Sequence, residues 1–124
     1  MDHSLFTNAP IGIITTTLDG EILATNPAMA RMFGYDSPDE LIESLNGIIT
    51  QLYADPSDRE KLLRLLKENE EVVNYECRGI LRDGDTIWVS INASAIREKN
   101  GGIIHVQSFI TDITEKKRLG VLFA

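Results

Sequence analysis

Apolar and polar residues alternate along two parts of the chain, one near each end, and the alternation predicts β-strands there. Near the N-terminus, residues 11–17 and 21–25 are rich in β-branched side chains and are separated by the turn signal Asp19-Gly20. Three longer segments of the same kind follow in the second half, separated by glycine-containing turns: residues 72–82, 86–97 and 103–112. The pattern therefore predicts an N-terminal hairpin and a C-terminal meander.

The middle of the chain has helical spacing, and prolines mark where the helices are expected to begin. A capping residue precedes each of three prolines, and proline suits the first helical position because no hydrogen bond of the helix needs its N–H. These pairs are Asn26-Pro27, Ser37-Pro38 and Asp55-Pro56. After Pro56, leucines at helical spacing predict the longest helix, whose polar side, including Arg59, is expected to face water. The order of elements predicts an α+β domain in which helices cover one face of a five-stranded antiparallel sheet.

The two faces of the predicted sheet carry different side chains. In residues 86–97, apolar residues alternate with Trp88 and small polar residues, so the apolar set faces the helices. Inner-face and helix residues together outline a mostly apolar pocket candidate: Met29, Phe33, Leu62, Leu66, Tyr75, Cys77, Val89, Ile91, Ser108 and Ile110. The same residues could instead pack closely and leave no pocket. The outer face carries Trp88, His105 and Phe109, and aromatic side chains there favour contact with another surface, an N-terminal helix or a second protomer.

Composition and charge narrow the function classes. The chain has 124 residues, which suits one domain, and its net charge of −7 argues against a nucleic-acid partner. No apolar stretch is long enough to span a membrane, and residues 1–4 lack the features of a signal peptide, so a cytoplasmic location without membrane contact is expected. The single cysteine, Cys77, excludes an intrachain disulfide and a cysteine-based zinc site, and its strand position favours a buried apolar role over a redox sensor. The predicted inner face has no carboxylate and no histidine, which argues against a catalytic role for this domain.

Nine different short tracts stand at predicted turns, helix starts and strand ends along the chain. They are Ala9–Ile13, Leu18–Glu21, Asn26–Ala28, Phe33–Tyr35, Asp55–Arg59, Arg82–Gly84, Trp88–Val89, Asp112–Thr114 and Glu115–Arg118. In this order and spacing, over residues 5–118, the sequence resembles the PAS family. The resemblance implies a sheet order of 2-1-5-4-3 and a pocket between the sheet and the helices. It also implies a sensory module that detects a small molecule, light or redox state, or only dimerises, and that relays the result to a linked effector.

The resemblance also bears on cofactors. Haem-binding PAS domains usually supply a histidine from the long helix, and residues 56–69 contain none. Flavin photosensors of the family need a reactive cysteine in the central helical region, and residues 36–54 contain none. Haem and a covalent flavin adduct are therefore disfavoured, and a small metabolite stays open as the ligand.

The resemblance assigns residues 1–118 to one sensory domain and residues 119–124 to the start of a linker toward an effector, such as a histidine kinase or a diguanylate cyclase. Asp112 and Thr114 lie at the exit from the last strand and are candidates for the signal relay, with Thr114 expected to cap a helix that begins at Glu115. The first hypothesis is a sensor domain, as in two-component systems, that forms a homodimer and relays ligand or dimer state through its last strand. The alternative is a ligand-free dimerisation or protein-interaction module.

Overall fold

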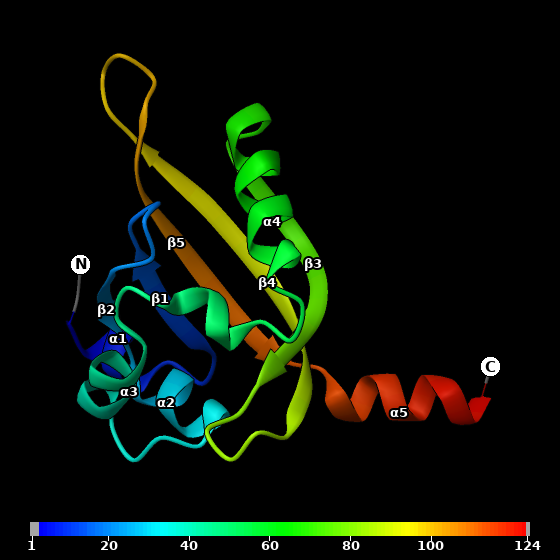
Figure 1. The fold of residues 1–124 in the computed structure, drawn as a ribbon. Coiled ribbons are helices and arrows are strands. Elements are labelled where there is room, and N and C mark those ends of the chain that lie inside the picture. Colours follow the sequence, from blue (N-terminus) through cyan, green and yellow to red (C-terminus); the bar gives the residue numbers. More distant parts are fainter. Residues whose placement is uncertain (1–2, 124) are drawn as a thin grey trace.

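The computed structural model describes residues 3–123 and contains one antiparallel sheet with helices packed on one face (Figure 1). The strands are β1 (Gly12–Thr16), β2 (Ile22–Thr25), β3 (Glu71–Ile80), β4 (Thr86–Arg97) and β5 (Ile103–Asp112). The helices are α1 (His3–Asn8), α2 (Pro27–Phe33), α3 (Pro38–Leu45), the 3₁₀-helix η1 (Ile49–Leu52), α4 (Ser57–Glu68) and α5 (Thr114–Phe123). The strand order is β2-β1-β5-β4-β3, so the predicted α+β class and sheet order are confirmed. Residues 1, 2 and 124, at the ends of the predicted domain and linker, lie outside the described residues.

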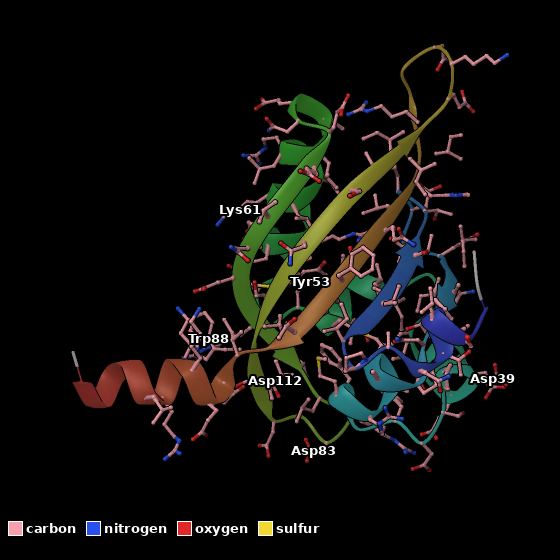
Figure 2. All side chains as sticks on the ribbon, turned by 180° about the vertical axis from the view of Figure 1, so that it is seen from behind. Asp39, Tyr53, Lys61, Asp83, Trp88 and Asp112 are labelled. Atoms are coloured by element: carbon pink, nitrogen blue, oxygen red, sulfur yellow. The ribbon has the colours of Figure 1, made fainter. Side chains whose placement is uncertain are left out.

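β1 and β5 pair at the centre of the sheet although most of the chain separates them. Their register places Ile14 opposite Ser108 on the inner face and Ile13 opposite Phe109 on the outer face. Figure 1 shows α2, α3 and α4 over the inner face, whereas α5 leaves the end of β5 and extends away from the sheet. Figure 2 shows the outer face of β3, β4 and β5 from the side opposite these helices.

Asn26 connects three elements at the point where α2 begins. Its side chain is fully buried, and its Oδ1 accepts hydrogen bonds from the backbone N–H groups of Ile13 at 2.9 Å and Met29 at 3.1 Å. Its Nδ2 donates to the carbonyl oxygens of Phe6 at 3.1 Å and Ile11 at 3.0 Å. One amide therefore caps α2 as predicted and also fastens α1 and the start of β1 to it.

The other two proline-marked helices begin in different ways. Ser37 Oγ accepts a hydrogen bond from the N–H of Glu40 at 3.1 Å, which is the predicted cap of α3. α4 begins at Ser57, one residue after Pro56, and Asp55 Oδ1 accepts from the N–H of Ser57 at 3.0 Å. Asp55 thus lies just outside α4 and accepts a hydrogen bond from the first backbone N–H of the helix, which has no partner within the helix.

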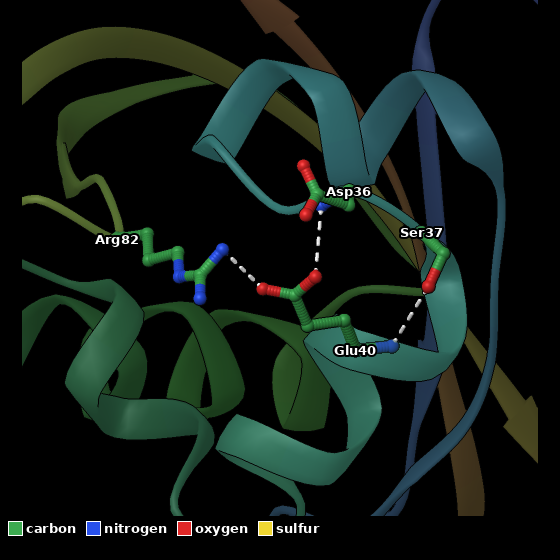
Figure 3. A network of polar contacts seen from close by, with 4 residues as sticks. All are labelled: Asp36, Ser37, Glu40 and Arg82. Atoms are coloured by element: carbon green, nitrogen blue, oxygen red, sulfur yellow. Dashed lines mark hydrogen bonds and ion pairs between the residues drawn. The ribbon is translucent and has the colours of Figure 1, made fainter.

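Glu40 also ties the helices to the hairpin between β3 and β4 (Figure 3). Its carboxylate accepts from the N–H of Asp36 at 3.2 Å and forms an ion pair with Arg82, which follows β3. The N–H of Arg82 donates to the carbonyl oxygen of Phe33 at 2.9 Å, and its guanidinium lies 5.9 Å from the ring centre of Tyr35. These contacts hold the hairpin against the end of α2.

Candidate functional site

A small cavity lies between the inner face of the sheet and the helices. Its volume is about 30 Å³, which is room for about two water molecules. Seven of the ten predicted pocket residues line it: Met29, Phe33, Cys77, Val89, Ile91, Ser108 and Ile110. The other three do not line it: Leu62 and Leu66 are buried elsewhere in the core, and Tyr75 directs its hydroxyl to Asp58 Oδ1 at 2.6 Å.

The cavity wall also includes residues that the sequence analysis did not assign to it. β1 contributes Ile14 and Thr16, and their inward direction follows the alternation already visible in residues 11–17. Further wall residues come from η1, the residue after it, and β3: Ile49, Leu52, Tyr53, Arg78 and Gly79. The segment around η1 has no regular apolar spacing, so no sequence pattern marks its inner side.

The Arg59 side chain lies at one end of the cavity and gives that end its charge. This placement corrects the prediction that Arg59 faces water. The sequence pattern puts this side chain in water, but only 4% of the residue is exposed. Its Nη2 donates to Thr16 Oγ1 at 3.1 Å and to the carbonyl oxygen of Thr17 at 3.0 Å. The first turn of α4 is thereby fastened to the end of β1, which is why its polar side chain points inward.

Tyr53 lies beside Arg59 and keeps its proton. Burial raises the pKa of Tyr53 above its ordinary value, and the charge and hydrogen bond of Arg59 offset only part of that rise. The hydroxyl is therefore neutral near pH 7 and is able to donate a hydrogen bond. The cavity combines a mostly apolar wall with a polar end, where the Arg59 guanidinium lies near the hydroxyls of Thr16 and Tyr53.

Cys77 is buried in the cavity wall, which argues against a redox sensor. The residue is 4% exposed, and burial, with a smaller contribution from the charge of Asp58, raises the pKa of its thiol to about 12. A redox-sensing thiol needs exposure and a lowered pKa. Cys77 has neither property, because its thiol is buried and its pKa is raised.

Alkaline pH is expected to weaken the fold through Cys77. The pKa of the thiol is 9.0 without the protein environment and about 12 in the fold, so the unfolded chain releases its proton first as the pH rises. The thiol's stabilising contribution is complete below pH 9.0 and is lost as the pH rises toward about 12. Urea unfolding at about pH 8 and about pH 10 should show a loss of about 1 kcal/mol from this group.

The variant Cys77→Ala is the control for this loss. It should lose less stability over the same pH interval, while the raised pKa of Tyr53 keeps part of the alkaline sensitivity in both proteins. Equal losses in the variant and the wild type would contradict the assignment to Cys77.

The exit from β5 is hydrogen-bonded to β4. The N–H of Trp88 donates to Thr114 Oγ1 at 3.0 Å, and the N–H of Ile113 donates to the carbonyl oxygen of Trp88 at 2.8 Å. Asp112 Oδ1 accepts from the N–H of Thr114 at 2.9 Å. Figure 2 shows Trp88 and Asp112 near the start of α5. This corrects the expected cap, because α5 begins at Thr114 itself and the Thr114 hydroxyl accepts from β4.

Trp88 is half-buried between side chains that reach it from β3 and α5. The guanidinium of Arg78 lies 5.0 Å from the ring centre, and Lys117 Nζ lies 4.8 Å from it. Lys117 Nζ also forms an ion pair with Glu76 Oε1 at 2.5 Å. Trp88, a candidate for the dimer face, thus contacts the exit helix of its own chain through cation–π attraction.

The other dimer-face candidates, His105 and Phe109, lie half-buried on β5. Phe109 stands opposite Ile13 of β1, and His105 stands opposite Ile96 of β4. Ile96 is 43% exposed. This part of the outer face therefore keeps apolar surface open to solvent.

Two other kinds of site can be checked in the described part of the chain. Within residues 3–123, no group of three or more His, Cys, Asp or Glu residues is placed to hold a metal ion. None of the helices in that range is both long and apolar enough to cross a membrane.

A 2-1-5-4-3 antiparallel sheet with helices over a small cavity defines an α+β domain with helices on one face. The sequence model of the family described as "PAS domain" matches residues 10–115, and the chain belongs to this family. Members of the family are in general non-catalytic sensory modules.

The chain is similar to segments of two curated proteins and to one solved structure. It is 29% identical over 119 residues to the sensor histidine kinase TmoS of Ectopseudomonas mendocina, covering 93% of this chain and 12% of that protein. It is 30% identical over 112 residues to the probable diguanylate cyclase DgcE of Escherichia coli (strain K12), covering 87% of this chain and 10% of that protein. The crystal structure of a PAS domain from Colwellia psychrerythraea superposes with a TM-score of 0.75 at 21% identity, covering 90% of this chain and 93% of that one. The chain thus spans about a tenth of the curated relatives that it matches.

Proposed function

We propose that residues 1–118 form the sensory input domain of a multidomain signalling protein, and that residues 119–124 begin the linker to its effector. The relatives support this proposal, because a sensor histidine kinase and a probable diguanylate cyclase each contain a matching segment within a much longer chain. An effector of one of these two types would receive the signal, and the domain would work in the cytoplasm. The domain itself binds and relays and does not catalyse.

The observation that carries the proposal is the attachment of α5 to β4. The backbone N–H and carbonyl of Trp88 are both engaged by the junction, through Thr114 and Ile113. Lys117 adds a second attachment one helical turn later, over the Trp88 ring and against Glu76. A shift of β4 relative to β5 would therefore move the start of α5.

Such a junction suits a relay between two states. The inner face of β4 contributes Val89 and Ile91 to the cavity wall, while its neighbouring residue Trp88 holds α5. A change in cavity occupancy that repacks Val89 would alter the pairing of β4 with β5 and bias the position of the exit helix. Asp112 and Thr114 then act as positioning residues of the relay.

The relay is tested by Thr114→Val in a chimaera in which this chain replaces the TmoS segment that it matches. The substitution keeps the β-branched shape and removes the oxygen that accepts from Trp88 N–H. We expect autophosphorylation of the chimaera to change by at least about threefold, because a net hydrogen bond of about 1 kcal/mol no longer holds one junction state.

Thr111→Val is the matched control, since Thr111 is exposed on β5, three residues before Thr114. It should leave autophosphorylation unchanged, and circular dichroism should show both variants folded. If the Thr114→Val chimaera is folded and has the autophosphorylation rate of the unsubstituted chimaera, the relay proposal is wrong.

A dimerisation or interaction module is the second candidate function, and the open apolar surface near Ile96, His105 and Phe109 favours it. A homodimer formed through this face is compatible with sensing, because many relays work between two copies. Sedimentation of the isolated chain at rising concentration tests the dimerisation candidate. If the chain stays monomeric at all concentrations, the dimerisation candidate is wrong and the sensory proposal stands without a homodimer.

A further inference from the structure

We propose that the cavity binds a small carboxylate of the formate and acetate class, with the Arg59 guanidinium as its counter-ion and the Tyr53 hydroxyl as a hydrogen-bond donor. The proposal rests on the proposed sensory function and names the chemistry of its ligand. It follows from the charge, the size and the lining of one enclosed space.

Within residues 3–123, Arg59 is a buried cation without a carboxylate partner. The ion pairs among the described residues involve Arg82, Lys117 and Arg118, and none involves Arg59. The hydrogen bonds that its Nη2 makes, to Thr16 Oγ1 and the carbonyl oxygen of Thr17, go to neutral oxygens. A guanidinium carries five N–H donors and stays charged, so neutral acceptors leave its charge uncompensated.

Burial of an uncompensated charge is costly, and this cost favours a ligand-binding role for Arg59 over a purely structural one. An apolar side chain of similar length would fill the same space without the desolvation penalty of a guanidinium. The adjacent carboxylate of Asp58 accepts the Tyr75 hydroxyl at 2.6 Å and forms no ion pair with Arg59. An anion that enters the cavity would supply the missing negative charge, and arginine matches a carboxylate by two parallel hydrogen bonds.

Tyr53 supplies the second polar group at the same end. Arg59 lies close enough to Tyr53 to lower the pKa of its hydroxyl through charge and hydrogen bonding, and because an arginine can only donate, the tyrosine oxygen is the acceptor toward it. The hydroxyl hydrogen remains available to an anion. Burial raises the pKa of Tyr53, so the hydroxyl is protonated at neutral pH and does not repel the anion.

The rest of the cavity sets the size and the apolar end of the ligand. The volume of about 30 Å³ corresponds to about two water-sized groups. The wall away from Arg59 is formed by apolar side chains that include Met29, Phe33, Val89 and Ile110. Formate fits this space directly, and acetate places one methyl group against the apolar wall.

The test is thermal unfolding of the whole chain at neutral pH in sodium acetate, against sodium chloride at equal ionic strength. We expect acetate to raise the unfolding temperature of the wild type saturably, with a Kd on the order of 1 mM for so small a ligand. Arg59→Met should weaken acetate binding at least about tenfold. Arg64→Met, which removes the same charge from the exposed side of α4, should bind as the wild type does.

Chain length is tested in the same way. Sodium formate should also stabilise the wild type, and sodium butyrate should not, because its additional methylene groups exceed the cavity. Equal stabilisation by butyrate would overturn the assignment of the ligand to this cavity. No acetate-specific rise in the wild type, or equal rises in the wild type and a folded Arg59→Met, would overturn the proposal.

A second measurement does not depend on the folding of Arg59→Met. In the wild type, NMR should show contacts between the acetate methyl group and the methyl groups of Met29 and Val89, and their absence at saturating acetate would overturn the proposal. Tyr53→Phe should bind acetate more weakly than the wild type. Failure of acetate binding leaves the Thr114→Val result in the chimaera unaffected, so the two proposals can fail separately.

Discussion

Replacement of Asn26 by alanine is expected to lower the free energy of unfolding by about 3–5 kcal/mol, one of the two largest effects of a single substitution in this domain. The amide side chain is fully buried and makes four hydrogen bonds to backbone groups, those of Phe6, Ile11, Ile13 and Met29. Alanine leaves these groups without a partner where water has little access, and each buried orphan costs about 1–3 kcal/mol. Urea unfolding followed by circular dichroism measures the loss.

Asn69→Ala is the matched control for Asn26→Ala. Asn69 is exposed, and its Nδ2 donates to the carbonyl oxygen of Leu65 at 3.0 Å, where water can replace it. Its loss should stay below about 0.5 kcal/mol. If the two variants lose similar stability, Asn26 does not connect α1, β1 and α2 in the way that the geometry indicates.

The sequence was sufficient for the fold because its local signals agree with one another. Asn26 and Ser37 act as the predicted caps, and the alternation in residues 86–97 gives the correct inner face. The pairing of β1 with β5 is different. It joins residues at opposite ends of the chain, and only the resemblance to a known family predicted it.

The local pattern was insufficient where a long-range contact decides the position of a side chain. Arg59 has the spacing of a solvent-facing helix residue, yet its Nη2 bonds β1 more than forty positions away in sequence. Thr114 has the position of a helix cap, yet its hydroxyl accepts from Trp88 of β4. Helical periodicity and capping rules describe only neighbours along the chain, so neither partner was accessible to them.

The same limit applies to β3 and to the cavity wall. The register of β3 on β4 shifts between Val72 and Tyr75, and Asn74 between them has a φ of 55°. Such a bulge inserts a residue into one strand and has no reliable signal in an alternating sequence. Tyr75 keeps the predicted parity but turns its hydroxyl to Asp58, outside the cavity.

The polar end of the cavity and the exit of β5 lie on different parts of the same sheet. A relay between them therefore depends on how the strands of the sheet connect the two places. Arg59 is bonded to the end of β1, β1 pairs with β5, and β5 continues into α5. β4 gives a second connection, since Val89 lines the cavity and Trp88 holds Thr114. In the proposed relay, occupancy of the cavity would reach α5 through either strand, and packing along both strands must be rigid for this to work.

That rigidity depends on the core between α4 and the sheet, where Leu62→Ala is expected to cost about 3 kcal/mol. Leu62 has no exposed surface, and alanine would leave a void that the surrounding helix and strand side chains cannot fully close. The void is separate from the native cavity, because Leu62 does not line it. Leu65→Ala, on the same helix at 37% exposure, should cost less than about 1 kcal/mol. The midpoint of urea unfolding measures both losses, and a Leu62→Ala midpoint no lower than that of Leu65→Ala would show that α4 does not pack on the sheet through Leu62.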